Sequence, residues 1–141
     1  MMLVAVDPGN DTGWARFLHG RLEACGLGVP PMIKHASVIV ECPEYRAHDR
    51  VNPNVLIELA IKVGRHVERA ASLGIAAELV RPSEWKGSVP KKIHQPRICR
   101  ELDAQELELL GDVLCLHSQS KGHNVVDAVG IGLFHLGRLP R

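Results

Sequence analysis

The sequence lacks any run approaching the roughly 18 consecutive apolar residues that a membrane span requires. Its first residues, MMLVAVD, have neither a basic leader nor a cleavage-site pattern, so we expect no membrane association and no secretory signal. It also lacks a C-x-x-C pair, because its 4 cysteines are widely spread. This spacing argues against a zinc site and against the disulfide framework of a small secreted protein, and it favours reduced thiols in a cytoplasmic protein.

An excess of either charge is absent as well, because 17 Lys and Arg face 16 Asp and Glu, for a formal net charge of +1. That total does not indicate a nucleic-acid-binding protein, but the distribution is uneven. Lys and Arg far outnumber the single Glu between Arg81 and Arg100, and the acidic stretch ELDAQELELLGD follows. A local basic patch can steer a polyanion even when the protein is nearly neutral. A solvated surface loop explains the same charges equally well.

Apolar patterns in the first half of the chain predict strands. An expected meander of three strands comprises MLVAVD, GWARFLHG and RLEACGLG, with a tight hairpin at His19–Gly20. The prolines of GVPPMIKH predict a loop, and ASVIVE after it predicts a fourth, buried strand.

The second half alternates helical and strand patterns. We expect a helix over residues 52–74, then a fifth strand, IAAELVRP. A basic loop, SEWKGSVPKK, precedes a helix that starts near Pro96, and HNVVDAVGIGLFHLGRL predicts a final helix. This order predicts a mixed sheet with helices on its faces, an α/β or α+β layered fold, in a single domain over residues 1–141.

Three carboxylates occupy positions from which a site could form. Asp7 and Glu41 end two predicted strands, and Asp127 lies in the first turns of the last predicted helix. Each acid also has a simpler explanation. Asp7 suits a turn, Glu41 could be a solvated strand end, and Asp127 near a helix start would interact favourably with the helix dipole. If they converge, they repel one another unless a divalent cation neutralises them. Oxygen-only ligands suit Mg²⁺ or Mn²⁺.

The patterns around these acids resemble those of the RuvC-type Holliday junction resolvases, which belong to the RNase H-like (retroviral-integrase-like) superfamily. The resemblance rests on VAVDPGNDTGWARF, on SVIVE in a later strand and on HNVVDAVGIGL near the end, in this order. It implies an α/β, RNase H-like fold with a five-stranded mixed sheet and helices on both faces. The compact length is more similar to phage-encoded members than to cellular ones, and it implies the cytoplasm of a bacterial or phage-infected cell.

The resemblance also implies the site. Asp7, Glu41 and Asp127 match the three acidic metal ligands of the family. The family's fourth ligand, Asp or His, precedes the last aspartate by one helical turn, where this sequence has Asn124 and His123. Either residue shares a helix face with Asp127, so the choice between a carbonyl ligand and a metal-binding or proton-handling imidazole stays open.

The activity implied is two-metal-ion phosphodiester hydrolysis that leaves 5′-phosphate and 3′-hydroxyl ends. The expected cofactor is Mg²⁺ or Mn²⁺, with two ions in each site and no nucleotide cofactor. The expected substrate is a four-way (Holliday) DNA junction, which a homodimer would cut by paired symmetrical nicks. The family dimerises partly through the helix after the fourth strand, here NVLIELAIKVGRHV.

Basic residues beside the acids are the candidate DNA contacts. Side chains that could neutralise backbone phosphates without reading bases are Arg81, Lys86, Lys91, Lys92 and Arg97. Tyr45 and Arg46, shortly after Glu41, could touch the strand-exchange point. Trp85 is interpreted as a packing residue.

Three other functions share parts of this pattern. An actin-like or sugar-kinase ATPase also opens with a strand, an acidic glycine turn and a hairpin, but it needs two such domains and a much longer chain than 141 residues. A non-catalytic junction-binding protein would not need all three acids. An RNase H-like nuclease acting on other branched DNA or on RNA–DNA hybrid would share the metal site, and the sequence does not separate it from a resolvase.

Overall fold

The computed structural model describes residues 1–48 and 50–140. Five strands form one sheet in the order β3-β2-β1-β4-β5: β1 (Met2–Asp7), β2 (Gly13–Leu18), β3 (Arg21–Leu27), β4 (Ser37–Glu41) and β5 (Glu78–Val80). The sheet is mixed, because β4 pairs parallel to β1 and β5, while β2 is antiparallel to β1 and β3. The predicted meander and the fourth strand are confirmed; the fifth is shorter than predicted.

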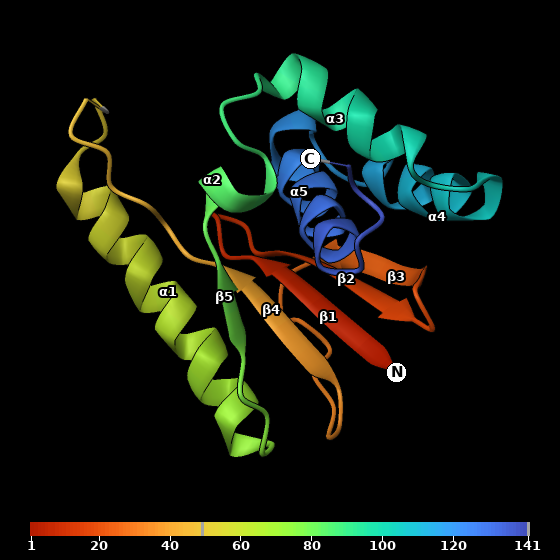
Figure 1. Cartoon of the computed structure of the whole chain (residues 1–141), viewed down its shortest axis with the longest axis horizontal. Coiled ribbons are helices and arrows are strands. Elements are labelled where there is room, and N and C mark those ends of the chain that lie inside the picture. The colour runs from red at the N-terminus through yellow and green to blue at the C-terminus, as the bar shows by residue number, and fades with distance from the viewer. Residues whose placement is uncertain (49, 141) are drawn as a thin grey trace.

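The helices lie on both faces of this sheet (Figure 1). They are α1 (Pro53–Ser72), α2 (Pro82–Trp85), α3 (Lys91–Arg100), α4 (Ala104–Leu114) and α5 (Gln119–His135). Strand alternation sorts the core into two layers. Leu3 and Ala5 of β1 pack in the cluster that α5 covers, whereas Val4 and Val6 pack in the cluster that α1 covers. None of the helices described is long and apolar enough to cross a membrane.

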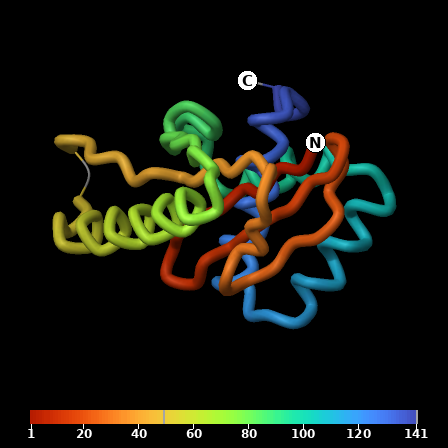
Figure 2. The backbone as a smooth tube through the Cα atoms, turned by 90° about the horizontal axis from the view of Figure 1, so that it is seen from below, coloured from red at the N-terminus to blue at the C-terminus, as the bar shows by residue number. Residues whose placement is uncertain are grey.

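Helix α1 begins as its sequence predicts. The side chain of Asn52 accepts a hydrogen bond from the backbone N–H of Asn54, and Pro53 occupies the first turn. Its first turns project beyond the sheet (Figures 1 and 2). Val55, Ile57 and Ile61 are exposed, whereas a helix packed only on its own sheet usually carries polar side chains on its outer face.

The segment after β5 differs from the prediction. The expected loop SEWKGSVPKK contains the short helix α2, and α3 starts at Lys91 instead of near Pro96. Pro90 precedes α3 with an extended backbone, and its fixed φ of −60° leads directly into the helix. Pro96 lies on the exposed side of α3, where a carbonyl that loses its helical partner can bond to water.

The single helix expected after Pro96 is two helices. Asp103 accepts a hydrogen bond from the backbone N–H of Glu106, and the carboxylate of Glu106 accepts one from the backbone N–H of Asp103. This capping box starts α4 and separates it from α3. Helix α5 begins at Gln119, earlier than predicted, so Asp127 lies in the middle of the helix. The helix-dipole explanation of Asp127 is therefore wrong, because that effect is confined to the first turn.

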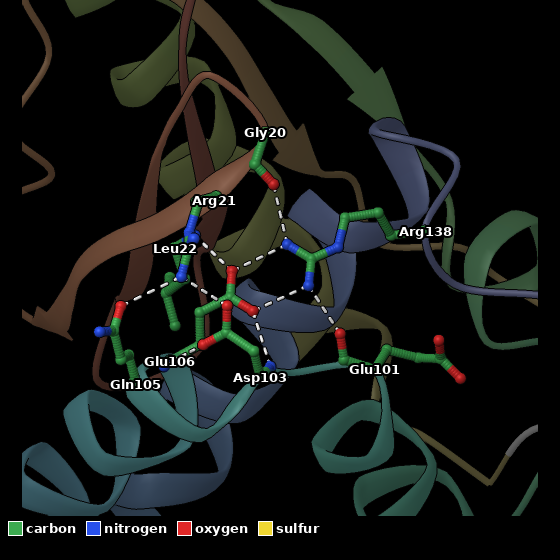
Figure 3. Close-up of polar contacts among 8 residues, drawn as sticks. All are labelled: Gly20, Arg21, Leu22, Glu101, Asp103, Gln105, Glu106 and Arg138. Carbon is green, nitrogen blue, oxygen red and sulfur yellow. Dashed lines mark hydrogen bonds and ion pairs between the residues drawn. The ribbon is translucent and has the colours of Figure 1, made fainter.

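A partly buried ion pair between Arg138 and Glu106 joins the residues after α5 to α4, and a hydrogen bond from Arg138 reaches the β2–β3 turn (Figure 3). Arg138 donates to both carboxylate oxygens of Glu106, with 2.8 Å between each nitrogen and oxygen, and to the backbone carbonyls of Gly20 and Glu101. Glu106 also accepts from the backbone N–H of Leu22 at 2.7 Å. These contacts fix α4 and the residues after α5 against β3.

Candidate active site at the carboxyl ends of β1 and β4

The parallel pairing of β1 and β4 brings two carboxylates to one edge of the sheet. Val6 lies opposite Val40, so Asp7 and Glu41 follow side by side at the ends of their strands. Both continue the alternation that directs Leu3, Ala5 and Ile39 toward α5. Asp127 of α5, which packs on β1 and β2, meets them there. The three acids therefore converge at this edge of the sheet.

The three carboxyl groups are poorly hydrated. Asp7 is 6% exposed, and the side chains of Glu41 and Asp127 are 14% and 8% exposed. Burial, followed by the negative charges of Glu41 and Asp127, raises the pKa of Asp7 to about 8. Burial is also the largest cause that raises the pKa of Glu41. The cluster therefore favours uptake of a proton or a cation.

One lysine already supplies positive charge to the cluster. Lys86, which follows α2, places its Nζ 3.6 Å from Glu41 Oε2 and 3.6 Å from Asp127 Oδ2. Burial acts against the charged ammonium, but attraction by Glu41, Asp127 and Asp7 outweighs it and raises the pKa of Lys86. The sequence pattern placed Lys86 among outward phosphate contacts; here it points at the acids.

Trp85 holds Glu41 from the other side. Its indole nitrogen donates a hydrogen bond of 2.6 Å to Glu41 Oε2, and its ring lies 4.9 Å from the Nζ of Lys86. Trp85 is buried, as the packing interpretation requires, and in addition it orients a candidate ligand. A buried His94 packs edge-on against its ring, with centroids 4.8 Å apart.

The chemistry of the donor set suits a hard divalent cation. Three carboxylates provide oxygen ligands, which Mg²⁺ and Mn²⁺ prefer. Across residues 1–48 and 50–140, however, no three His, Cys, Asp or Glu side chains are already arranged as a metal-ion cluster. The ammonium of Lys86 stands between two of the three acids. The residues fit a divalent ion in chemistry, provided that the lysine side chain moves.

The two candidates for a fourth ligand point in different directions. Asn124 lies beside the turn that follows Asp7: its amide nitrogen donates to the carbonyl of Asp11 at 2.7 Å, and its oxygen abuts Gly9. His123 is paired with Gln95 of α3, with 2.5 Å between Nδ1 and Nε2. It lines a separate pocket of about 370 Å³, which the three acids do not line.

The turn after Asp7 is held closely against α5 and α1. A Cβ on Gly13 would lie 2.0 Å from the backbone oxygen of Asn124, so only glycine permits this approach. The N–H of Gly9 donates to Asp7 Oδ1 at 3.1 Å, as expected of a turn aspartate. Lys62 of α1 donates to the carbonyls of Gly9 and Asn10 at 3.3 and 3.4 Å. This contact, which the sequence did not suggest, fixes the turn on its outer side.

The remaining candidate DNA contacts differ in how exposed they are. Arg81, Lys91, Lys92 and Tyr45 are exposed, while Arg97 and Arg46 are half-buried. Arg97 lines a pocket of about 510 Å³ together with Ser83 and Lys86. Arg46 is paired with Glu44 at 3.4 Å. Asp7 and Glu41 open onto a smaller pocket of about 200 Å³, whose far wall is formed by Leu56 and Leu59 of α1.

The comparisons identify the fold. No protein-family model matches the sequence, and no curated protein matches it either. Among solved structures, RuvC of Thermus thermophilus matches with a TM-score of 0.51 and 16% sequence identity, over 96% of this chain and 93% of that chain. A structure of T. thermophilus RuvC in complex with a Holliday junction substrate matches with a TM-score of 0.49 and 16% identity, over 96% and 92%. This chain therefore has the α/β, RNase H-like fold of RuvC, with a five-stranded mixed sheet and helices on both faces, as the sequence predicted.

Proposed function

We propose that this chain is a structure-specific endodeoxyribonuclease that resolves four-way DNA junctions by paired symmetrical nicks, as a single nuclease domain over residues 1–141. The observation that carries the proposal is the convergence of Asp7, Glu41 and Asp127 at one edge of an RNase H-like sheet. The junction as substrate rests on the resemblance of the motifs around these three acids to those of RuvC-type resolvases.

The chain's own residues would hold two divalent ions, Mg²⁺ or Mn²⁺. Asp7, Glu41 and Asp127 are the anionic ligands, and Asn124, which lies beside the Asp7 turn, is the preferred fourth. When bound, the ions would lower the pKa of the attacking water and stabilise the leaving 3′ oxygen. Trp85 orients Glu41, and the Gly9 N–H orients Asp7. His123, directed at Gln95, is the less favoured candidate.

The DNA would approach across the basic rim of the site. Arg81, Lys91 and Lys92 are exposed and free to neutralise phosphates on either side of the scissile bond. Arg97 would act from the pocket that Lys86 also lines. Tyr45, 64% exposed in the segment that follows Glu41, would meet the bases at the branch point, with Arg46 beside it.

Two strands of a junction must be cut, so a homodimer is part of the proposal. The exposed apolar side chains of Val55, Ile57 and Ile61 of α1 support a second copy as the partner of this helix. Sedimentation of the wild type and of Ile57→Glu tests this arrangement. A dimer that becomes monomeric in the variant is expected; a monomeric wild type contradicts it.

The activity is tested by incubating a synthetic four-way junction with Mg²⁺ or Mn²⁺, beside linear duplex, flap and RNA–DNA hybrid. Symmetrical nicks with ligatable ends are expected for the wild type and for the control Asp11→Asn, which changes a neighbouring loop acid. Asp7→Asn should abolish cleavage without loss of stability, because it removes one of three repelling buried carboxylates.

Other outcomes separate the alternatives. Cleavage of the hybrid alone would assign the chain to ribonuclease H activity. Junction binding without cleavage under either metal would indicate a non-catalytic junction-binding protein. Cleavage of flaps in preference to junctions would indicate a nuclease for other branched DNA.

A further inference from the structure

We propose that Lys86 is a displaceable counter-ion, which balances one of the two negative charges of Glu41 and Asp127 in the metal-free protein and competes with divalent metal for these two carboxylates. The inference deepens the proposed function and rests on it. The geometry that carries it is the position of the Lys86 Nζ, equidistant at 3.6 Å from Glu41 Oε2 and Asp127 Oδ2. Without this charge, the three carboxylates would face one another with no cation among them from residues 1–48 and 50–140.

The ammonium is attracted by charge more than it is fixed by short hydrogen bonds. Charge-assisted N–H···O bonds are typically about 2.7–2.9 Å long, and both ion pairs of Lys86 are longer. In contrast, Glu41 is held by Trp85 at 2.6 Å. A metal ion could therefore take the place of the ammonium while Glu41 stays oriented by the indole.

The surroundings of Lys86 give the displaced side chain a place to go. Its backbone is anchored, since its N–H donates to the carbonyl of Pro82 at 3.0 Å, so only the side chain needs to move. That side chain is 24% exposed, more than either carboxylate partner. It lines the open pocket of about 510 Å³ and lies near the face of Trp85, which can stabilise a cation.

Competition between the two cations has a measurable consequence. A divalent ion that enters must displace a unit positive charge from the same oxygens, so the lysine lowers the protein's affinity for metal. Removing the charge should raise that affinity by about tenfold or more, because unit charges a few ångströms apart near a protein surface interact strongly. It should also destabilise the metal-free protein, which then has no counter-ion for Glu41 and Asp127.

The test is titration of the full chain with Mn²⁺ alone, without DNA, followed by calorimetry. Lys86→Met keeps the aliphatic stem beside Trp85 and removes the charge; Lys86→Arg keeps the charge. Lys34→Met is the matched control, because Lys34 is an exposed cation that precedes β4, at the end of the strand opposite to Glu41. We expect Lys86→Met to bind Mn²⁺ about tenfold tighter than the wild type, and both other variants to bind like the wild type. Its metal-free unfolding temperature should fall, and Mn²⁺ should restore it.

Equal Mn²⁺ affinity in Lys86→Met and the wild type would overturn the inference, and junction cleavage by the wild type would then leave the proposed function standing. Tighter Mn²⁺ binding by Lys86→Met would support the inference. If the wild type then cleaves none of the nucleic acids, the proposed function is contradicted while the inference stands. Should Lys86→Met fail to fold, side-chain NMR of the wild type decides. Addition of Mg²⁺ is expected to shift the Lys86 signals and not those of Lys34, and unshifted Lys86 signals with Mg²⁺ bound would overturn the inference.

Discussion

The indole of Trp85 donates a hydrogen bond of 2.6 Å to the carboxylate of Glu41, across 44 positions of sequence. Trp85 belongs to α2, and Glu41 ends β4, so the bond joins the segment after β5 to the edge of the sheet that carries the acids. It leaves Glu41 with one fixed orientation before any metal or substrate binds. Trp85 is therefore a positioning residue for the proposed site.

Trp85→Phe should separate positioning from packing. A smaller aromatic ring still occupies much of the buried space, but the hydrogen bond to Glu41 is lost, so we expect kcat for junction cleavage to fall about tenfold or more with little change in KM. The free energy of unfolding should fall by only about 1–2 kcal/mol. Trp14→Phe is the control, because Trp14 lies against Gly26 of β3 and makes no contact with Glu41 in the described structure. Equal effects of both variants on kcat would contradict the role.

Gly132 of α5 should tolerate no side chain. A Cβ at this position would lie 2.1 Å from Cε2 of Phe17, whose ring is completely buried in β2. Gly132→Ala should lower the free energy of unfolding by about 1–3 kcal/mol, because the well-packed core must shift to admit it. Gly64 of α1 has nothing within 4 Å of its Cβ position, so Gly64→Ala should raise stability by roughly 0.5–1 kcal/mol. Denaturant unfolding measures the free energy of unfolding of both variants. Similar changes in the two variants would contradict the packing argument.

The strands of the sheet were predictable from local pattern, and the convergence of its acids from the resemblance to RuvC-type resolvases. Apolar runs that end on Asp7 and Glu41 indicate two buried strands, and parallel neighbours bring such ends to one edge. The start of α4 was also readable, because Asp103 followed by Glu106 is the signature of a capping box, but the apolar periodicity on either side concealed it. The early start of α5 was concealed by the polar run SQSK, which reads as a loop.

The contacts of Trp85 and Lys86 could not be predicted in the same way. Their direction depends on how α2 leaves β5 and on where α5 brings Asp127, and both are set by tertiary packing. A basic stretch with one aromatic residue therefore suggested phosphate contacts and a packing residue. Only the folded chain shows that one of its lysines points inward at the acids. The contact of Lys62 with the Asp7 turn is equally nonlocal.

His94 should be replaceable with a gain in stability. Its imidazole is 2% exposed, and neither ring nitrogen has a hydrogen-bond partner among the described residues. Burial is the main reason that the pKa of His94 lies below its ordinary 6.5. The unfolded chain therefore binds the proton more readily, and stability is lost as the pH falls below 6.5 toward the folded value.

His94→Leu removes both unpaired nitrogens at similar volume. We expect the free energy of unfolding to rise by about 1–2 kcal/mol at pH 7 and the loss of stability between pH 6.5 and 5 to become smaller. Thermal unfolding across this pH range checks both effects. His48→Leu changes an exposed histidine and should leave both unchanged. A destabilised His94→Leu would show that the imidazole contributes through its contact with Trp85 more than its burial costs.

Glu106 should control the stability of the fold in acid. Its side chain is 1% exposed, and although burial raises its pKa, hydrogen bonds from Arg138 and from the backbone N–H groups of Asp103 and Leu22 lower it from 4.5 to about 2. A carboxyl group with a depressed folded pKa contributes stability that is present above 4.5 and is lost as the pH falls toward 2. The shift corresponds to roughly 3 kcal/mol at neutral pH.

Glu106→Gln keeps the shape but leaves the guanidinium of Arg138 without its anion, so we expect a loss of about 3 kcal/mol at pH 7. The difference from the wild type should shrink as the pH falls from 5 to 2, because the native carboxylate is then protonated and the advantage disappears. Urea unfolding at several pH values measures this convergence. Glu108 is an exposed neighbour in α4, so the free energy of unfolding of Glu108→Gln should equal that of the wild type at every pH. A stability gap for Glu106→Gln that stays constant from pH 7 to pH 2 would mean that the contribution of Glu106 comes from shape and neutral hydrogen bonding, since a charge-dependent contribution must vanish with the charge.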